Sequence, residues 1–233
     1  MGGGMSIEMW LAEDENAAFR SELQSKVFDE FTWEPTLDAA DINVSVDDQV
    51  VTLSGAVKSY PEKLAAVRAA KRVRGVQAVR NDLAVVLPVG NQRSDREIAK
   101  AAFHVLEADV LVPRGAIQTT VTEGWVQLEG EVPQNAARSA AAAAVERLAG
   151  VKGVVNEITI TSAVPESDLK ARLGAALQRC AGLRGEHIDV ETGDGAVLLS
   201  GHVHCLAERD EAEQTVWALP GVASVRNELR VEG

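Results

Sequence analysis

Three histidines and one cysteine near the end of the chain have the residue types of a metal site. They are His187, His202, His204 and Cys205. Imidazole nitrogens and thiolate sulfur are common ligands of zinc and copper. A hairpin that turns at Asp194-Gly195 places His187 opposite His202, with His204 two residues further along the same face of the strand. The spacing therefore predicts a candidate metal site on this hairpin.

A plainer interpretation of the same residues is a solvated surface. The positions that correspond to the three histidines earlier in the chain are occupied by Asp41, Ala56 and Lys58, which is typical of an exposed face. Cys205 corresponds to Ser59, at the start of an expected helix, where the helix dipole favours a thiolate. The sequence leaves both interpretations open.

No other pattern in the chain predicts catalysis. The sequence has no glycine-rich loop followed by Lys and Ser or Thr, no Gly-x-Ser-x-Gly, no His-Glu-x-x-His and no Cys-x-x-Cys. Most carboxylates fall at solvent-facing helix positions, which is typical of a solvated surface. We therefore expect no catalytic residues, no cofactor and no enzyme activity.

The chain repeats one block three times without a gap, and this repeat determines the expected architecture. Each copy contains Val-x-Leu-x-Gly and, twenty residues after that glycine, Gly-Val-x-x-Val-x-Asn. The first glycine of each copy is expected where a strand meets a helix, and the second as a left-handed residue directly after a helix. The asparagine is expected to cap the backbone of a strand. These positions are Gly55, Gly75 and Asn81, Gly130, Gly150 and Asn156, and Gly201, Gly221 and Asn227.

The spacing of apolar residues changes in the same order within each copy. In the first copy, helical spacing over residues 19–31 is followed by alternation at 42–46 and 51–55. A second helix is expected from Ser59-x-x-Glu62, and in the second copy Ser94-x-x-Glu97 is a capping box before the first helix. Each copy thus predicts the order helix, strand, strand, helix, strand.

The three expected hairpin turns differ in quality. Asp194-Gly195 and Glu123-Gly124 suit a two-residue turn, whereas Asp48-Gln49 lacks the glycine that a left-handed position prefers. A hairpin about Asp48-Gln49 places Ile42 opposite Gly55 on the buried side. We expect this first turn to be the weakest of the three.

The sequence therefore predicts an α+β protein of three tandem αββαβ units, with boundaries 13–88, 93–162 and 165–232. Each unit is expected to be a three-stranded mixed sheet with both helices on one face. The connection from the second strand to the third is long enough for a parallel crossover. The connectors at 88–93 and 163–165 are too short to let the units move independently, so neighbouring units are expected to touch.

Composition narrows the classes of partner and location. With 23 Lys and Arg against 35 Asp and Glu, the formal charge is −12, so nucleic acid is not expected as a partner and anionic lipid is disfavoured as an electrostatic one. Two cysteines make no disulfide framework. Without a signal-like start or an apolar stretch of about 20 residues, the expected location is the cytoplasm, or the periplasm if a leader has been removed.

Taken together, these motifs resemble the BON domain family, named for bacterial osmotically inducible and nodulation-associated proteins. The pattern is an opening helix, Ile-x-Val-x-Val, Val-x-Leu-x-Gly, a second helix and Gly-Val-x-x-Val-x-Asn-x-Leu, repeated three times from about Asp14 to Val231. The resemblance implies an αββαβ module of osmotic-stress, transport-associated and secretin-linked proteins that binds phospholipid or another envelope component. It implies no catalysis, and such proteins are often exported to the periplasm.

Two hypotheses of function follow. The first is a non-enzymatic binding module of the stress or envelope-associated type, which contacts phospholipid, a membrane surface or a protein partner through its sheet faces and turns. The alternative is a structural scaffold whose outer surfaces dock other proteins. Trp125, beside a hairpin turn, is expected to pack against a neighbouring unit or to enter a lipid interface.

Overall fold

The computed structural model describes residues 7–161, 188–193, 195–219 and 221–232, together with Leu173 and Ala176. His187, the turn residue Asp194 and most of the first helix expected in the third unit lie outside the described residues. Among the helices that the structure describes, none combines the length and the apolar character needed to cross a bilayer.

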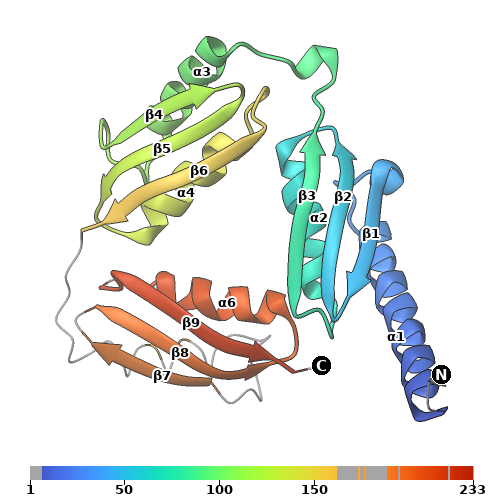
Figure 1. The fold of residues 1–233 in the computed structure, drawn as a ribbon. Coiled ribbons are helices and arrows are strands. Elements are labelled where there is room, and N and C mark those ends of the chain that lie inside the picture. The colour runs from blue at the N-terminus through green and yellow to red at the C-terminus, as the bar shows by residue number, and fades with distance from the viewer. Residues whose placement is uncertain are drawn as a thin grey trace, which may run out of the picture.

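The described elements fall into three similar units (Figure 1). The elements of unit 1 are α1 (Ile7–Thr32), the short η1 (Ala39–Asp41), β1 (Ile42–Asp47), β2 (Val50–Val57), α2 (Tyr60–Arg72) and β3 (Ala78–Val85). Those of unit 2 are η2 (Val89–Asn91), α3 (Asp95–Ala108), β4 (Ile117–Thr122), β5 (Trp125–Val132), α4 (Asn135–Glu146) and β6 (Gly153–Ile160). Those of unit 3 are β7 (Ile188–Gly193), β8 (Ala196–Val203), α6 (Leu206–Trp217) and β9 (Ser224–Val231).

Each unit has one three-stranded mixed sheet, which confirms the predicted fold class. The strand orders are β1-β2-β3, β4-β5-β6 and β7-β8-β9. In every sheet the first pair is antiparallel and the second pair is parallel. Ile42 lies opposite Gly55, as the hairpin about Asp48-Gln49 predicts.

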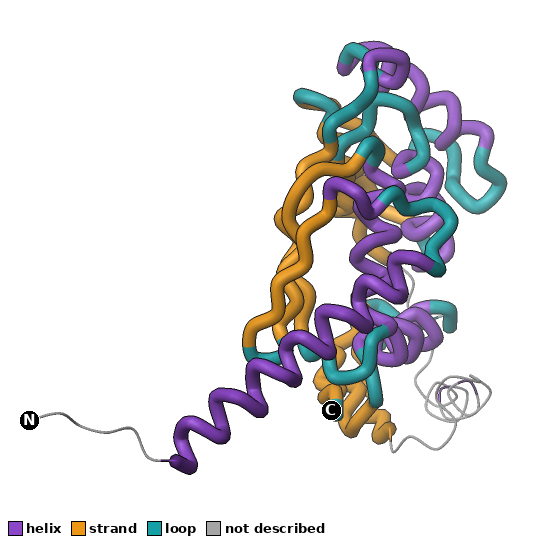
Figure 2. Tube along the Cα trace, turned by 90° about the vertical axis from the view of Figure 1, so that its right-hand side faces the viewer, coloured by secondary structure: helices purple, strands orange, loops and turns teal. Residues whose placement is uncertain are grey.

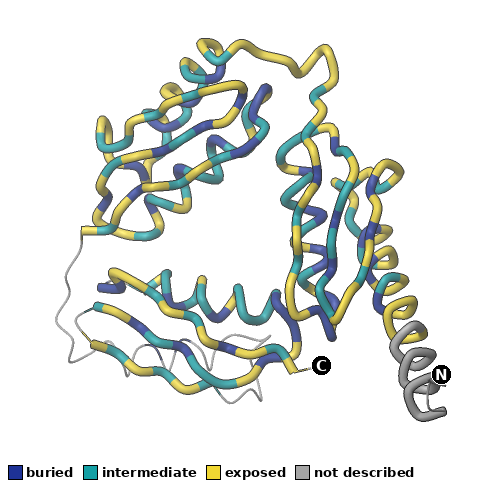
Figure 3. Tube along the Cα trace, viewed as in Figure 1, coloured by how far each residue is buried: buried dark blue, intermediate teal, exposed yellow. Residues whose placement is uncertain are grey.

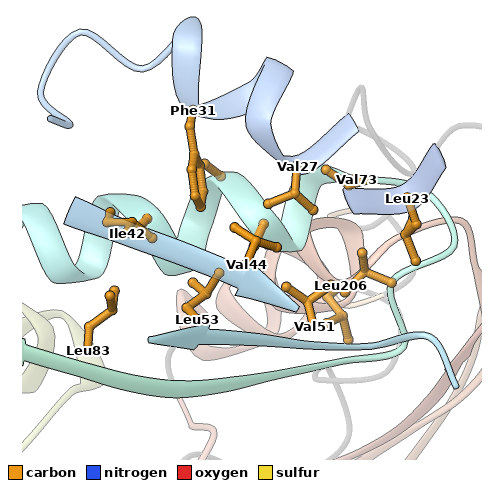
Figure 4. Close-up of a cluster of buried hydrophobic side chains, with 14 of the residues drawn as sticks. Leu23, Val27, Phe31, Ile42, Val44, Val51, Leu53, Val73, Leu83 and Leu206 are labelled. Carbon is orange, nitrogen blue, oxygen red and sulfur yellow. The ribbon is translucent and has the colours of Figure 1, made fainter. Parts of the chain in front are cut away.

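The core of each unit lies between the sheet and its helices. Along β2, Val51, Leu53 and Val57 are buried while the residues between them are not (Figure 3). The buried face of α2 consists largely of alanines, which lets the helix approach the sheet closely. In unit 1 this core also includes the buried side chains of α1, namely Leu23, Val27 and Phe31 (Figure 4).

The helix starts carry the expected caps, with one difference. At α3 the Ser94 Oγ accepts a hydrogen bond from the Glu97 N–H (3.4 Å) and Glu97 Oε2 accepts one from the Ser94 N–H (2.9 Å). At α2 the Ser59 Oγ accepts from the Glu62 N–H (3.3 Å), but the Glu62 carboxylate accepts from the Lys58 N–H (2.6 Å). The capping box expected at Ser59 is therefore shifted by one residue, because the Glu62 carboxylate is buried and reaches the turn before the helix.

The first glycine of each repeat lies where two backbones come too close for a side chain. A Cβ atom on Gly55 would lie 2.1 Å from the Asp41 carbonyl oxygen, and one on Gly130 would lie 2.1 Å from the Ala116 carbonyl oxygen. Both residues also have a positive φ, 110° and 146°. The hairpin strand can pass this carbonyl only if the residue has no side chain.

The second glycine lies one or two residues further from its helix than we expect from the sequence. Helix α2 ends at Arg72, and the Val76 N–H then donates to the Val73 carbonyl (3.3 Å) across Gly75. Gly75 has φ 88° at the third position of this turn, where a type II turn requires a left-handed residue. The expectation of a glycine directly after the helix cap is wrong, because a separate turn connects helix and strand.

The repeated asparagine joins the third strand to the second helix. In each unit its Oδ1 accepts a hydrogen bond of 3.2 Å from the backbone N–H two residues later. In units 2 and 3 its Nδ2 also donates to a carbonyl of the second helix, from Asn156 to Arg138 (3.3 Å) and from Asn227 to Arg209 (3.1 Å). The side chain therefore fixes the helix over the sheet.

The three units form a ring (Figure 1). In the view of Figure 2, the strands lie mainly on one side of the molecule and most helices on the other. The second helices α2, α4 and α6 meet one another at the junctions between units.

We predict that Gly130→Ala lowers the free energy of unfolding by about 3 kcal/mol or more, because the new Cβ would overlap the Ala116 carbonyl oxygen. Thermal and urea unfolding measure the change. Gly90→Ala is the matched control, since a Cβ there meets no atom within 4 Å, and it should change stability by less than about 0.5 kcal/mol. Equal stability of the two variants would contradict this account.

We predict that Gln49→Gly raises the free energy of unfolding by about 0.5–1 kcal/mol. Asp48 and Gln49 have φ of 44° and 65°, and the Gln49 Oε1 is buried without a hydrogen bond. Urea unfolding of the full chain measures this change in the stability of unit 1. Ser45→Gly, at an exposed strand position, should lower stability instead, and a loss of stability in Gln49→Gly would show that the turn is not strained.

Candidate functional site

The hairpin of unit 3 holds the described members of the predicted metal site. Ile188 pairs with Gly201 and Asp189 with Ser200, which is the register on which that prediction rests. His202 is exposed and lies opposite Arg230 of β9, and its Nε2 is 3.6 Å from Glu232 Oε1. His187, which the register would place opposite His202, lies outside the described residues.

His204 and Cys205 follow β8 and lead into α6. His204 is exposed, and its backbone N–H donates to Glu208 Oε2 (2.7 Å). Cys205 is the cap residue of α6 and is buried, with 7% of its surface exposed. Within the described part of the chain, no three His, Cys, Asp or Glu side chains come together as a group that could hold a metal ion. Metal binding by His187, His202, His204 and Cys205 stays a prediction.

The environment of Cys205 differs from the one that the sequence suggests. Burial raises the pKa of the Cys205 thiol, and this outweighs the lowering by the backbone N–H groups of Ala207 and Glu208 and by the nearby Arg74. The start of α6 thus favours a thiolate, as expected, but desolvation disfavours the charged form more strongly, so the pKa is raised and not lowered. Arg74 belongs to unit 1, so Cys205 lies beside a junction between units.

The junction of units 1 and 2 is made by the start of α2. Tyr60, the first residue of α2, packs against the core of unit 2, and its hydroxyl lies near the backbone of Val154. Burial raises the pKa of the Tyr60 hydroxyl. Near the end of α4, burial raises the pKa of Glu146, and Arg68 of α2 acts in the opposite direction. The start of α2 thus meets the last turn of α4.

The junction of units 2 and 3 repeats this arrangement one unit further on. The segment 133–136 at the start of α4 lies against residues 217–219 and 221–222 at the end of α6. The Arg138 guanidinium lies over the Trp217 ring, 5.8 Å from its centre. An open cleft of about 420 Å³ runs between the two helices, with Ser139, Ala143 and Gln214 among its walls.

The junction of units 3 and 1 closes the ring with the same geometry. Leu206, the first residue of α6, is 6% exposed and belongs to the core cluster of unit 1. Lys71 Nζ of α2 is 2.7 Å from Asp210 Oδ2 of α6. Every junction therefore joins the start of one second helix to the end of another, and Lys71, Glu146 and Trp217 each stand four residues before the second glycine of their repeat.

The sequence analysis did not identify Tyr60 and Leu206 as contacts between units. Both residues occupy the first position of a second helix, where Asn135 stands in unit 2. An apolar side chain at this otherwise solvent-facing position is the signal that could have indicated a contact outside the unit.

Trp125 lies on the outer face of the sheet of unit 2. Its ring lies against Gly153, so that a Cβ on Gly153 would come within 2.3 Å of a ring atom. Trp125 is 51% exposed, and Val155, two residues beyond Gly153 on the same strand, is 42% exposed. Trp125 thus packs on the sheet of its own unit, where Gly153 leaves room for the indole, and its packing against a neighbouring unit stays a prediction.

A second hollow, of about 610 Å³, lies between the connector after β3 and the hairpin of unit 2. Arg93, Asp95 and Lys152 are among its lining residues. The Asp95 carboxylate accepts hydrogen bonds from the backbone N–H groups of Glu123 (2.8 Å) and Gly124 (2.9 Å). This carboxylate is therefore used to fix the hairpin turn.

Comparison with known proteins finds the same threefold division. The family model described as BON domain matches residues 20–86, 94–162 and 165–233. Osmotically-inducible protein Y of Escherichia coli (strain K12) is 30% identical over 159 residues, which cover 66% of this chain and 79% of that protein.

Two solved structures of CdsD, a structural protein of the type III secretion system of Chlamydia trachomatis, also match at 14% identity. The first covers 91% of this chain and 92% of its own, with a TM-score of 0.25. The second, of the C-terminal domain, covers 91% and 98%, with a TM-score of 0.26.

We predict that Cys205 reacts slowly with the neutral reagent iodoacetamide and that the rate still rises above pH 9, because burial raises the pKa of its thiol. The measurement uses a Cys180→Ser background, which leaves Cys205 as the one thiol of the chain. The same protein unfolded in urea is the control and should react at least tenfold faster at pH 8. A fast reaction that levels off below pH 8 would instead indicate a stabilised thiolate.

Proposed function

Since this chain belongs to the BON domain family in all three of its units, we propose that it is a non-enzymatic binding protein of the osmotic-stress and envelope-associated type. The similarity to a protein named for osmotic induction supports the stress association. The proposed partner is a phospholipid surface, which the chain contacts through the outer sheet face of unit 2.

The half-exposed Trp125 is the observation that carries this proposal. An indole that lies flat on Gly153 presents a rigid apolar surface to solvent, and Val155 extends that surface along β6. Trp side chains favour the boundary between water and lipid, where the ring is partly buried and its N–H remains near polar groups. The outer face of unit 2 therefore has the chemistry of a shallow lipid contact.

The charge of the chain determines which lipids fit. A formal charge of −12 repels an anionic surface at low salt, and Glu129 and Glu157 lie on the same outer face as Trp125. The contact we propose is made by apolar insertion and not by ion pairing. Zwitterionic headgroups are therefore preferred to anionic ones, and added salt should reduce the difference between them.

The alternative function is a scaffold that docks other proteins, and one observation favours it. Phe28 and Phe103 occupy corresponding positions of α1 and α3, and they are 38% and 59% exposed. Two similar aromatic side chains held at fixed spacing by a ring of units would suit a repeated protein partner. If the chain binds no vesicle, the scaffold function replaces lipid binding as the proposed function.

We predict that the protein co-sediments with phosphatidylcholine vesicles and that Trp125→Ala reduces the bound fraction about tenfold, because the variant loses the inserted indole. Trp33→Ala is the matched control: Trp33 is 82% exposed in unit 1, far from this sheet face in sequence, and its loss should leave binding unchanged. Absence of binding to neutral and anionic vesicles alike would remove the lipid proposal.

A further inference from the structure

The junction that closes the ring joins two helices of opposite charge. Helix α2 carries four basic residues and one acid, and α6 carries four acids and one basic residue, whereas α4 has one of each. The bases of α2 are Lys63, Arg68, Lys71 and Arg72, and the acids of α6 are Glu208, Asp210, Glu211 and Glu213. We propose that the contact between α2 and α6 is a latch that rising ionic strength loosens, so that unit 3 leaves unit 1.

The central ion pair of this contact is open to screening by salt. Lys71 Nζ and Asp210 Oδ2 are 2.7 Å apart, and their side chains are 30% and 42% exposed. Ion pairs with this exposure contribute little, and their attraction weakens as the Debye length shortens from about 14 Å at 0.05 M salt to about 4 Å at 0.5 M. Other bases of α2 have partners elsewhere, Arg72 with Glu30 of α1 and Glu34, and Arg68 near Glu146 of α4, so Lys71 is the base of α2 that faces α6 in the described contact.

The apolar part of the contact responds differently to salt. Leu206 is buried in the core cluster of unit 1 (Figure 4), and Val231 of β9 packs against the same cluster from unit 3. Salt does not weaken apolar burial. The contact therefore has an apolar part that salt does not weaken and a charged part that salt does weaken. A rise in ionic strength acts on the charged part alone.

A rise in ionic strength acts less directly on the contacts at the other two junctions. Tyr60 packs against the apolar core of unit 2, and Arg138 lies over the Trp217 ring. Both of these junctions join units that are consecutive in the chain, so a short connector keeps their partners together. Lys71 and Asp210 are 139 residues apart, and the closing junction is the one without such a connector.

This inference deepens the proposed function and rests on it for its biological meaning, since osmotic stress changes the ionic strength around a protein. An open ring would expose Leu206, the basic end of α2 and the buried Cys205. The latch would thereby make the opening of the ring depend on ionic strength, which osmotic stress changes.

Cys205 is a natural reporter of the latch, because it is buried at the start of α6 and lies beside Arg74 of unit 1. In the Cys180→Ser background, the rate of reaction with the neutral reagent N-ethylmaleimide is measured between 0.05 M and 0.5 M NaCl. We expect the rate to rise about threefold over this range, as the screened charges lose part of their attraction.

The ion pair can be tested by exchange of its charges. Lys71→Ala and Asp210→Ala should each raise the rate at 0.05 M NaCl and reduce its dependence on salt. The double variant Lys71→Asp with Asp210→Lys should restore the slow rate and its dependence on salt. Arg226→Ala is the matched control, because it removes an exposed ion pair with Glu228 that lies outside the contact. It should change neither the reaction rate at 0.05 M NaCl nor the dependence of that rate on salt.

A rate that is constant or that falls with salt would overturn the latch. Leu206→Ala separates the two parts of the contact: it should raise the rate and keep the dependence on salt, and circular dichroism shows whether the variant is folded. Vesicle binding is measured independently, so a chain that shows the salt-dependent rate but binds no lipid would contradict the proposed function and not the latch.

Discussion

The insertion of one helix start into the core of another unit is the contact on which the arrangement of this protein depends. A unit of about 70 residues buries only about 60% of the surface of its unfolded chain, so each unit alone is only marginally stable. Leu206 completes the core of unit 1, and Tyr60 packs against that of unit 2. The cores of units 1 and 2 each receive the start of a helix from another unit, so a neighbour in the ring supplies part of the burial that a single unit lacks.

The repeat made the fold of the single unit predictable from sequence. The mixed sheet and the pairing of Ile42 with Gly55 follow from alternating residues and a two-residue turn. The turn that holds Gly75 did not follow, because a left-handed residue suits both a helix cap and the third position of a type II turn. In the candidate site, the burial of Cys205 was not predictable, because the corresponding residue of the first unit is Ser59, a partly exposed helix cap. His187 lies outside the described residues, so the metal site was neither found nor excluded.

The three junctions share their geometry and differ in their chemistry. Lys71, Glu146 and Trp217 occupy one position of the repeat, and each meets a residue from the start of the preceding helix around the ring: Asp210, Arg68 and Arg138. An exchange of units 2 and 3 would place the Lys71 ammonium against Arg138 and the Glu146 carboxylate against Asp210. Such a mismatch opposes the wrong order of units, so the differences at this position help to specify which unit lies beside which.

The ring also bears on how chain order relates to structure. The units follow one another around the ring in the order in which they are synthesised, and the α2–α6 junction is the place where the polypeptide does not continue from one unit to the next. A gene that began with unit 2 and ended with unit 1 would encode a protein that buries the same surfaces at the same three junctions. The contacts around the ring are in that sense indifferent to which junction lacks a connecting segment.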